Sequence, residues 1–220
     1  MSRMHRGVLA AVGLLILCVS AAVSRSHGSK ARSGTPGVFD YYVLSLSWSP
    51  QHCFEKSDDS NECNGSRPFG FVVHGLWPQY NRGYPSGCSG PAFDKSQVPE
   101  HLIDWMPSWQ LIRHEWQTHG TCSGLEQSSY FVLVIRARKA VRIPAQYTQL
   151  LRQIEVTPGQ IRAAFAQANP GGDPSSFAVI DDGRFLREVH ACLNKDLAMQ
   201  SCTSPGDRDD DRGIVMRPVR

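Results

Sequence analysis

The sequence predicts a single α+β domain that is stabilised by disulfide bonds. Three observations support this fold class: a length of 220 residues, strand patterns that mostly precede helix patterns, and six cysteines beyond the N-terminal segment. A chain of this length fits one domain, and strands followed by helices with few β-α-β units favour the α+β class. Apolar residues make up 41% and charged residues 20%, which is ordinary globular composition.

Residues 1–24 are typical of a secretory signal peptide. Arg3 and Arg6 precede an apolar run over residues 8–23, and small residues follow around 21–24. Removing two arginines and no acidic residue leaves 21 basic against 20 acidic residues. We therefore expect an exported protein, periplasmic or secreted, with no stable membrane association after cleavage. Its near-neutral charge does not by itself indicate a nucleic-acid partner.

The remaining chain divides into three parts. Residues 25–37 are rich in Gly, Ser and basic residues, which indicates a flexible lead-in. A catalytic domain is expected over residues 38–206, and residues 207–220 are expected to be a charged C-terminal tail. The acidic run in that tail is interpreted as solvated rather than metal-binding; it comprises Asp207, Asp209, Asp210 and Asp211.

The cysteines indicate disulfides. An even number of cysteines in an exported chain predicts disulfide bonds, and six allow 15 pairings. Short loops favour Cys53–Cys63 and Cys192–Cys202, which leaves Cys88 and Cys122 to join distant segments. A structural zinc site would need closely spaced CxxC or HxxxH pairs, and the sequence contains none.

Strand patterns occur at three places. Residues 40–48 (DYYVLSLSW) alternate and are rich in Tyr, Val and Leu, which predicts a strand. Residues 69–73 (FGFVV) predict a short buried strand that ends at His74, where Gly75 would let the backbone turn. Residues 185–193 are a third, weaker candidate.

Helix patterns follow. Apolar residues at helical spacing predict a helix over 109–119, which Gly120 would end. Residues 146–155 and 157–168 are also predicted to be helical, the second with Thr157 as its N-cap. Residues 130–140 are ambiguous because their β-branched content competes with their length.

The segment His114-Glu115-Trp116-Gln117-Thr118-His119 carries groups that can do acid/base chemistry. A zinc protease would need HExxH, with histidines four residues apart on one helix face. His114 and His119 are five apart, about 140° on a helix, so they diverge. Glu115 and His119 are four apart and project together, which suits acid/base chemistry.

The segment around His74 adds a second imidazole. Trp77 follows closely, so an acid/base group and an indole would stand together. Two histidines on different elements suit a phosphodiester cleavage that needs one base and one acid. The 2′-OH of RNA would supply the nucleophile, so that no metal is required.

The segments FVVHGLWP (71–78) and HEWQTHGTC (114–122) resemble the two active-site segments of the ribonuclease T2 family. DYYVLSLSWSPQHC (40–53), AAFAQANPG (163–171) and FLREVHACLNKDL (185–197) are similar to other parts of that family, so the resemblance spans about residues 39–202. It implies a central, mainly antiparallel β-sheet packed with several α-helices. It also implies a monomeric endoribonuclease of single-stranded RNA that needs no metal or other cofactor.

The resemblance further implies a mechanism through a 2′,3′-cyclic phosphate that is hydrolysed to a 3′-phosphate. His119 would take the proton of the 2′-OH, and His74 would protonate the leaving 5′-oxygen. His114 would contact phosphate, and Glu115 would stabilise the pentacovalent centre. Trp77 would stack on the base 5′ of the cut.

Two positions depart from the family pattern. Thr118 stands where a lysine is common, so a cation near the developing charge is lost unless Arg113 or Arg82 replaces it. Gln79 stands where an aspartate is common, which predicts broad or altered base preference. Thr118 also supports an alternative, a weakly catalytic T2-fold protein that binds RNA or acts as a regulator.

The other aromatic and histidine side chains are expected to have structural roles. This group comprises Trp48, Trp109, Trp116, His52, His101 and His190.

Overall fold

The computed structural model of the chain describes residues 31–56, 62–203 and 211–219. The expected signal peptide and most of the acidic run of the tail lie outside these residues. In the described part, no helix combines the length and the apolar character that crossing a membrane requires.

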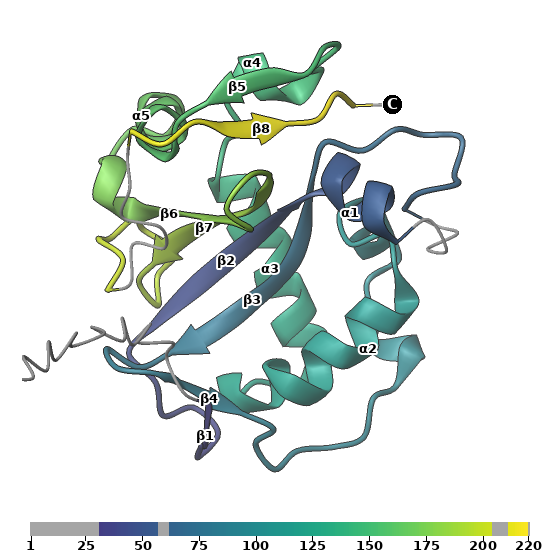
Figure 1. Cartoon of the computed structure of the whole chain (residues 1–220). Helices are drawn as coiled ribbons and strands as arrows, with labels where there is room; N and C mark the ends of the chain where they lie inside the picture. The colour runs from purple at the N-terminus through teal and green to yellow at the C-terminus, as the bar shows by residue number, and fades with distance from the viewer. Residues whose placement is uncertain (1–30, 57–61, 204–210, 220) are drawn as a thin grey trace, which may run out of the picture.

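A four-stranded antiparallel sheet forms the centre of the molecule (Figure 1), as the sequence predicts. Its spatial order is β3-β2-β7-β6, with bounds β3 Phe71–Gln79, β2 Tyr41–Trp48, β7 Leu186–Leu193 and β6 Phe177–Asp181. The central strand β2 pairs with β3 on one side and with β7 on the other. Residues that are far apart in sequence are thereby brought side by side.

The main core lies on one face of this sheet. Alternate residues of β2 (Tyr42, Leu44, Leu46 and Trp48) are buried there. Side chains of α3 (Gln127–Ala140) and α5 (Pro158–Ala168) belong to the same core. Figure 1 shows α3 behind β2 and β3. The ambiguous segment 130–140 is therefore helical, because Tyr130, Phe131 and Val134 pack against the sheet.

The remaining helices are short except for α2. They are α1 (Ser49–Glu55), α2 (Trp109–Thr118) and α4 (Ala145–Thr148), with 3-10 helices at Lys95–Gln97, Glu100–Asp104, Gly120–Ser123 and Pro174–Ser176. The predicted N-cap of α5 is confirmed: the Thr157 side chain accepts from Gln160 N, and the Gln160 side chain accepts from Thr157 N.

The helix predicted over 146–155 is wrong for most of its length. α4 ends at Thr148, and the β-branched residues Ile154 and Val156 belong to strand β5 (Ile154–Val156). β5 pairs with β8 (Ile214–Met216), a segment distant in sequence. A local pattern does not reveal such a partner, and tertiary pairing overrides helical propensity here.

Further strands lie where no regular structure was expected. β8 is in the predicted charged tail, and its Ile214 and Met216 are fully buried, so residues 214–216 belong to the core. β1 (Ala31–Ser33) is in the predicted lead-in and pairs in parallel with β4 (Tyr84–Ser86). The pattern of the sequence also gave no signal for β6.

The three disulfides are Cys53–Cys63, Cys88–Cys122 and Cys192–Cys202. The pairing favoured by short loops is confirmed. The Cys88–Cys122 bond, whose cysteines are 34 positions apart in sequence, ties the segment after β4 to the segment after α2.

Candidate active site

The face of the sheet opposite the main core carries polar and aromatic side chains. Strand register places Ser45 opposite His190 and Ser47 opposite Glu188 on the β2–β7 side. On the β2–β3 side, Trp77 lies opposite Val43. Because opposite residues of paired strands share a face, these side chains form one surface.

His74 occupies a β-bulge within β3. Ser45 pairs with Gly75 and Leu46 pairs with Val73, so His74 is the extra residue of its strand. The prediction of a strand that ends at His74 and turns at Gly75 is therefore wrong, since β3 continues to Gln79. A bulge can redirect a side chain without ending the strand, and here it presents His74 at the site.

Helix α2 supplies a carboxylate to the same place. Ser108 caps its N-terminus by accepting from Leu111 N, and Glu115 lies on its buried side with 1% of its side chain exposed. Trp77 Nε1 donates to Glu115 Oε2 at 2.7 Å. The other oxygen, Oε1, lies 3.7 Å from His74 Nε2.

Gly75 makes room for this contact. A Cβ atom at Gly75 would overlap the Glu115 carboxylate and the Trp77 indole nitrogen. The glycine is thus required by the close approach of α2 to β3 rather than by a turn.

We expect Gly75→Ala to lower the cleavage rate about 100-fold, the scale of a 1 Å displacement of a catalytic group. The new methyl group must push Glu115 or Trp77 away. Steady-state assays on a single-stranded RNA measure the effect, and Gly70→Ala, whose Cβ would meet its nearest atoms at 3.5 Å, tests a glycine outside the site. An active Gly75→Ala enzyme would show that the position of Glu115 is not critical.

His119 caps the C-terminal end of α2. Its backbone N–H donates to Glu115 O at 3.0 Å, and the residue is 9% exposed. Its ring centroid is 5.2 Å from that of Trp77, and the His74 centroid is 5.3 Å from the same indole. His74 and His119 therefore lie against one indole, which the His190 ring also contacts at a centroid distance of 5.2 Å.

Two buried polar atoms of this cluster have no hydrogen-bond partner in the described part of the chain. They are Glu115 Oε1 and His119 Nδ1. Unsatisfied buried polar atoms are costly and uncommon in folded proteins. Their occurrence together is typical of a site that completes its hydrogen bonds on binding a ligand.

The cluster lies between two cavities. The larger, of about 300 Å³, is lined by Trp77, His119 and Gln79 together with Tyr41, Tyr84 and His190. The smaller, of about 100 Å³, is lined by His74, Ser47 and Leu111, among others. His119 thus faces one cavity, and His74 faces the other.

The surroundings shift the pKa values of the two histidines in opposite directions. Burial lowers the pKa of His119 to about 3, and the positive charges of His114 and His74 act in the same direction. Burial also acts to lower the pKa of His74, but a hydrogen bond to Glu188 and the negative charges of Glu188 and Glu115 outweigh it, so this pKa is raised. His119 is therefore neutral and His74 tends to be protonated.

The carboxylate of Glu115 is also perturbed. Burial raises its pKa to about 7, although the charge of His74 and the Trp77 hydrogen bond oppose this change. Glu115 is therefore poised to gain or lose a proton near neutral pH.

The four residues predicted to bind substrate lie in two different places. Trp77 and Gln79 line the larger cavity. His114 and Thr118 are neighbours on the outer side of α2, with Thr118 Oγ1 3.5 Å from the His114 ring nitrogens. Arg113, considered as a substitute cation, instead has its guanidinium 5.5 Å from the Phe93 ring centroid.

Sequence reasoning missed Glu188 and assigned His190 a structural role. The structure places Glu188 on His74 at 2.6 Å and His190 in the wall of the larger cavity. Their alternation along β7 was a usable signal, because residues 188 and 190 must share a face. Which face that is depends on the pairing with β2, which sequence alone does not give.

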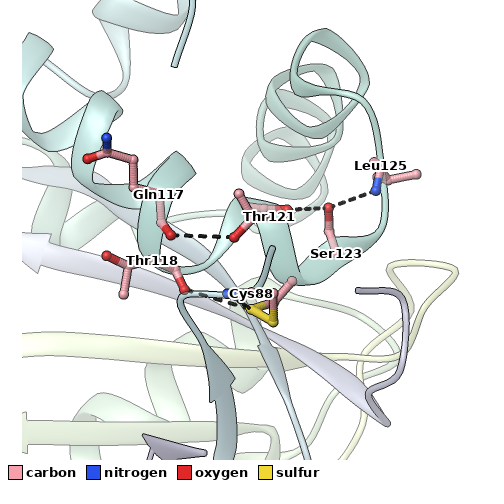
Figure 2. Close-up of a disulfide and its surroundings, with 8 residues drawn as sticks. Cys88, Gln117, Thr118, Thr121, Ser123 and Leu125 are labelled. Carbon is pink, nitrogen blue, oxygen red and sulfur yellow. Dashed lines mark hydrogen bonds between the residues drawn. A yellow bond between two sulfur atoms is a disulfide. The ribbon is translucent and has the colours of Figure 1, made fainter. Parts of the chain in front are cut away.

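A backbone hydrogen bond and a disulfide fix the segment that carries His119. Gly87 N donates to Thr118 O at 2.8 Å, beside the Cys88–Cys122 disulfide. Figure 2 shows Thr118 and Thr121 around this disulfide, with Thr121 Oγ1 donating to Gln117 O.

In the described part of the chain, no group of three or more His, Cys, Asp or Glu side chains is arranged to hold a metal ion.

Comparisons with known proteins identify similar sequences. A model of the ribonuclease T2 family matches residues 39–202. A ribonuclease of Aeromonas hydrophila is 41% identical over 165 residues, which cover 74% of this chain and 75% of that protein. Extracellular ribonuclease LE of Solanum lycopersicum is 27% identical over 134 residues, covering 54% of this chain and 55% of the relative.

Solved structures are similar as well. A mutant of RNase MC1 in complex with 5′-UMP has a TM-score of 0.61 and 25% identity, covering 75% of this chain and 93% of that chain. RNase NT in complex with 5′-AMP has a TM-score of 0.65 and 23% identity, covering 83% of this chain and 100% of that chain. The second similarity supports the fold alone.

Proposed function

Because this chain belongs to the ribonuclease T2 family and is an endoribonuclease, we propose that it cleaves single-stranded RNA without a metal ion. The products would be a 2′,3′-cyclic phosphate and then a 3′-phosphate. The observation that carries this proposal is the placement of His74 and His119 against one tryptophan with opposite protonation preferences.

In the first step, neutral His119 accepts the proton of the ribose 2′-OH. The 2′-oxygen attacks phosphorus, and the bond from phosphorus to the 5′-oxygen breaks. Protonated His74 gives its proton to that leaving oxygen. In the second step, water attacks the cyclic phosphate and gives a proton to His74, the bond from phosphorus to the 2′-oxygen breaks, and His119 returns the proton to that oxygen, as microscopic reversibility requires.

The two cavities support this assignment of roles. The nucleotide that carries the 2′-OH must lie beside the base, and His119 lines the larger cavity with Trp77. The leaving nucleotide must lie beside the acid, and His74 lines the smaller cavity with Leu111. The scissile phosphate would then lie between the cavities.

Further side chains would act on the substrate. Glu115, whose pKa is about 7, would in its protonated form donate a hydrogen bond from Oε1 to a phosphoryl oxygen. His114 would contact the phosphate from the outer side of α2. Trp77 and Gln79 would contact the base in the larger cavity, where the amide of Gln79 can donate or accept and so favours broad base preference.

The test is cleavage of a short single-stranded RNA in excess EDTA, with products resolved by mass. We expect undiminished cleavage, with a 2′,3′-cyclic phosphate that forms first and a 3′-phosphate that replaces it. Loss of activity with chelator, or a 5′-phosphate product, would contradict the proposal. RNA binding without cleavage would instead favour the weakly catalytic alternative.

The pH dependence follows from the two histidines. The first step needs His119 neutral, which holds above about pH 3, and His74 protonated, which holds below its raised pKa. We therefore expect activity from acidic to neutral pH and a decline on the alkaline side. A pH profile of kcat/KM for transphosphorylation measures this, and a profile that rises through neutral pH into the alkaline range would contradict it.

Thr118 offers a direct test of the missing cation. We expect Thr118→Lys to raise kcat about tenfold, because a positive charge near the phosphate stabilises the transition state. Thr148→Lys, at the exposed end of α4, adds the same charge elsewhere and should leave kcat unchanged. Equal rates for Thr118→Lys and the unmodified enzyme would show that this position does not limit turnover.

We also propose that the mature enzyme is exported, periplasmic or secreted, and monomeric. Three disulfides are typical of an oxidising compartment. Fractionation of producing cells and size-exclusion chromatography test these two statements separately.

A further inference from the structure

We propose that Glu188 is a positioning residue for His74, which orients the imidazole and holds its proton for the leaving oxygen. This inference rests on the proposed function, in which His74 is the general acid. Glu188 would not touch the substrate; it would act through His74.

The contact between the two side chains is close. Glu188 Oε1 lies 2.6 Å from His74 Nδ1, across the pairing of β7 with β2 and of β2 with β3. The Glu188 side chain is 17% exposed and that of His74 is 34% exposed. The carboxylate is thus less exposed to solvent than the imidazole that it contacts.

The carboxylate is itself fixed by other hydrogen-bond donors. Ser47 Oγ donates to Oε1 at 3.1 Å, and Ser45 Oγ donates to Oε2 at 2.9 Å. His190 Nε2 lies 2.7 Å from Oε2. Four side chains therefore surround Glu188, and a carboxylate held in this way has little freedom to leave His74.

This arrangement determines which nitrogen of His74 reacts. An ionised carboxylate only accepts hydrogen bonds, so Nδ1 of His74 carries a proton toward Glu188. Nε2, which faces Glu115 Oε1 at 3.7 Å, is then the atom that gives and regains the catalytic proton. Glu188 selects the reactive tautomer in the same way as the third member of a nucleophile–base–orienter set.

The charge of Glu188 adds to its orienting effect. Burial would raise the pKa of Glu188, but the hydrogen bonds and charges of His190 and His74 hold it well below its usual range. The carboxylate is therefore ionised throughout the working pH range. Its negative charge stabilises protonated His74 against the effect of burial, and Glu115 and Glu62 act in the same direction. His119 is neutral and adds no opposing charge.

Two substitutions separate orientation from charge. Glu188→Gln keeps an oxygen that can accept from His74 Nδ1 but removes the negative charge, whereas Glu188→Ala removes both. We expect Glu188→Gln to lower kcat for transphosphorylation about tenfold to 100-fold, a part of the 10²–10⁴ that a positioned acid contributes. KM should change little, and Glu188→Ala should lose more.

The critical measurement is an NMR titration of His74 in each variant, since it does not depend on activity. Loss of the carboxylate charge should lower the pKa of His74, and the alkaline limb of the pH profile should move to lower pH with it. Hydrolysis of a 2′,3′-cyclic nucleotide uses His74 in its neutral form, so Glu188→Gln should slow this step less. Glu155→Gln, an exposed carboxylate on β5, is the matched control and should change none of these values.

The outcomes distinguish this inference from the proposed function. If His74→Ala is inactive while Glu188→Gln has an unshifted His74 titration and normal kcat, the role of Glu188 is refuted and the two-histidine mechanism stands. If His74→Ala remains active, the proposed function itself fails. If Glu188→Ala does not fold, the Glu188→Gln titration still decides, because the amide preserves the shape of the side chain.

Discussion

Replacing His119 by alanine is expected to lower kcat/KM for single-stranded RNA by about 10²–10⁴, the contribution of a positioned general base. His74→Ala should cause a loss of the same order, because the leaving 5′-oxygen then departs without a proton. Both rings lie against the Trp77 indole, and His190, whose ring centroid is also 5.2 Å from the indole, is held by Glu188 Oε2 at 2.7 Å from its Nε2. Rescue by a neighbouring side chain is therefore not expected.

His101→Ala is the matched control for both variants. His101 is exposed, and its Nδ1 lies 3.8 Å from the surface carboxylate of Asp104. Its removal should leave kcat/KM and the melting temperature unchanged. If His119→Ala retained more than a tenth of the activity while remaining folded, another group would have to remove the 2′-OH proton, and the assigned roles would be wrong.

The double variant should be less impaired than the product of the single losses. His74 and His119 act in one concerted proton exchange, and once either is absent the other contributes little. Residues that act as a unit show this non-additivity. Multiplicative losses would indicate that the two histidines work in separate steps.

Much of the site could be predicted from sequence because its chemistry is carried by two continuous segments. Glu115 lies on α2 and His119 is the C-cap of that helix, so their four-residue spacing determines how they lie relative to each other. His74 and Trp77 are three residues apart in one strand. In a regular strand this spacing would put the two side chains on opposite faces, so the bulge at His74, which the local pattern did not reveal, brings them together.

Glu188 and His190 could not be placed in the same way. Their role depends on the pairing of β7 with β2, which joins segments more than 140 residues apart. A shift by one residue would turn both side chains to the core face. The same limit explains why β5 and β8 were missed, since neither strand is stable without the other.

The disulfide between Cys88 and Cys122 should contribute strongly to both stability and activity. Cys122 lies three residues after His119, and Cys88 follows strand β4, whose Tyr84 lines the larger cavity. The bond therefore joins the proposed base to a wall of the cavity in which its substrate would lie. The hydrogen bond from Gly87 N to Thr118 O, at 2.8 Å, connects the same two segments.

We expect Cys88→Ala/Cys122→Ala to lower the free energy of unfolding by about 2–5 kcal/mol, the usual cost of losing a native disulfide in a small secreted domain. Below its melting temperature, the variant should also show a raised KM, because the cavity wall is no longer tied to His119. Denaturant unfolding and steady-state kinetics measure the two effects separately.

Cys53→Ala/Cys63→Ala is the control, since it removes a disulfide whose cysteines are only 10 positions apart in sequence, compared with 34. In the chain-entropy model the shorter loop stabilises less, by about 1 kcal/mol. The control should therefore lose less stability, and its KM should stay closer to that of the unmodified enzyme. An equal rise of KM in both variants would mean that general loosening, rather than the link between His119 and the cavity wall, impairs substrate binding.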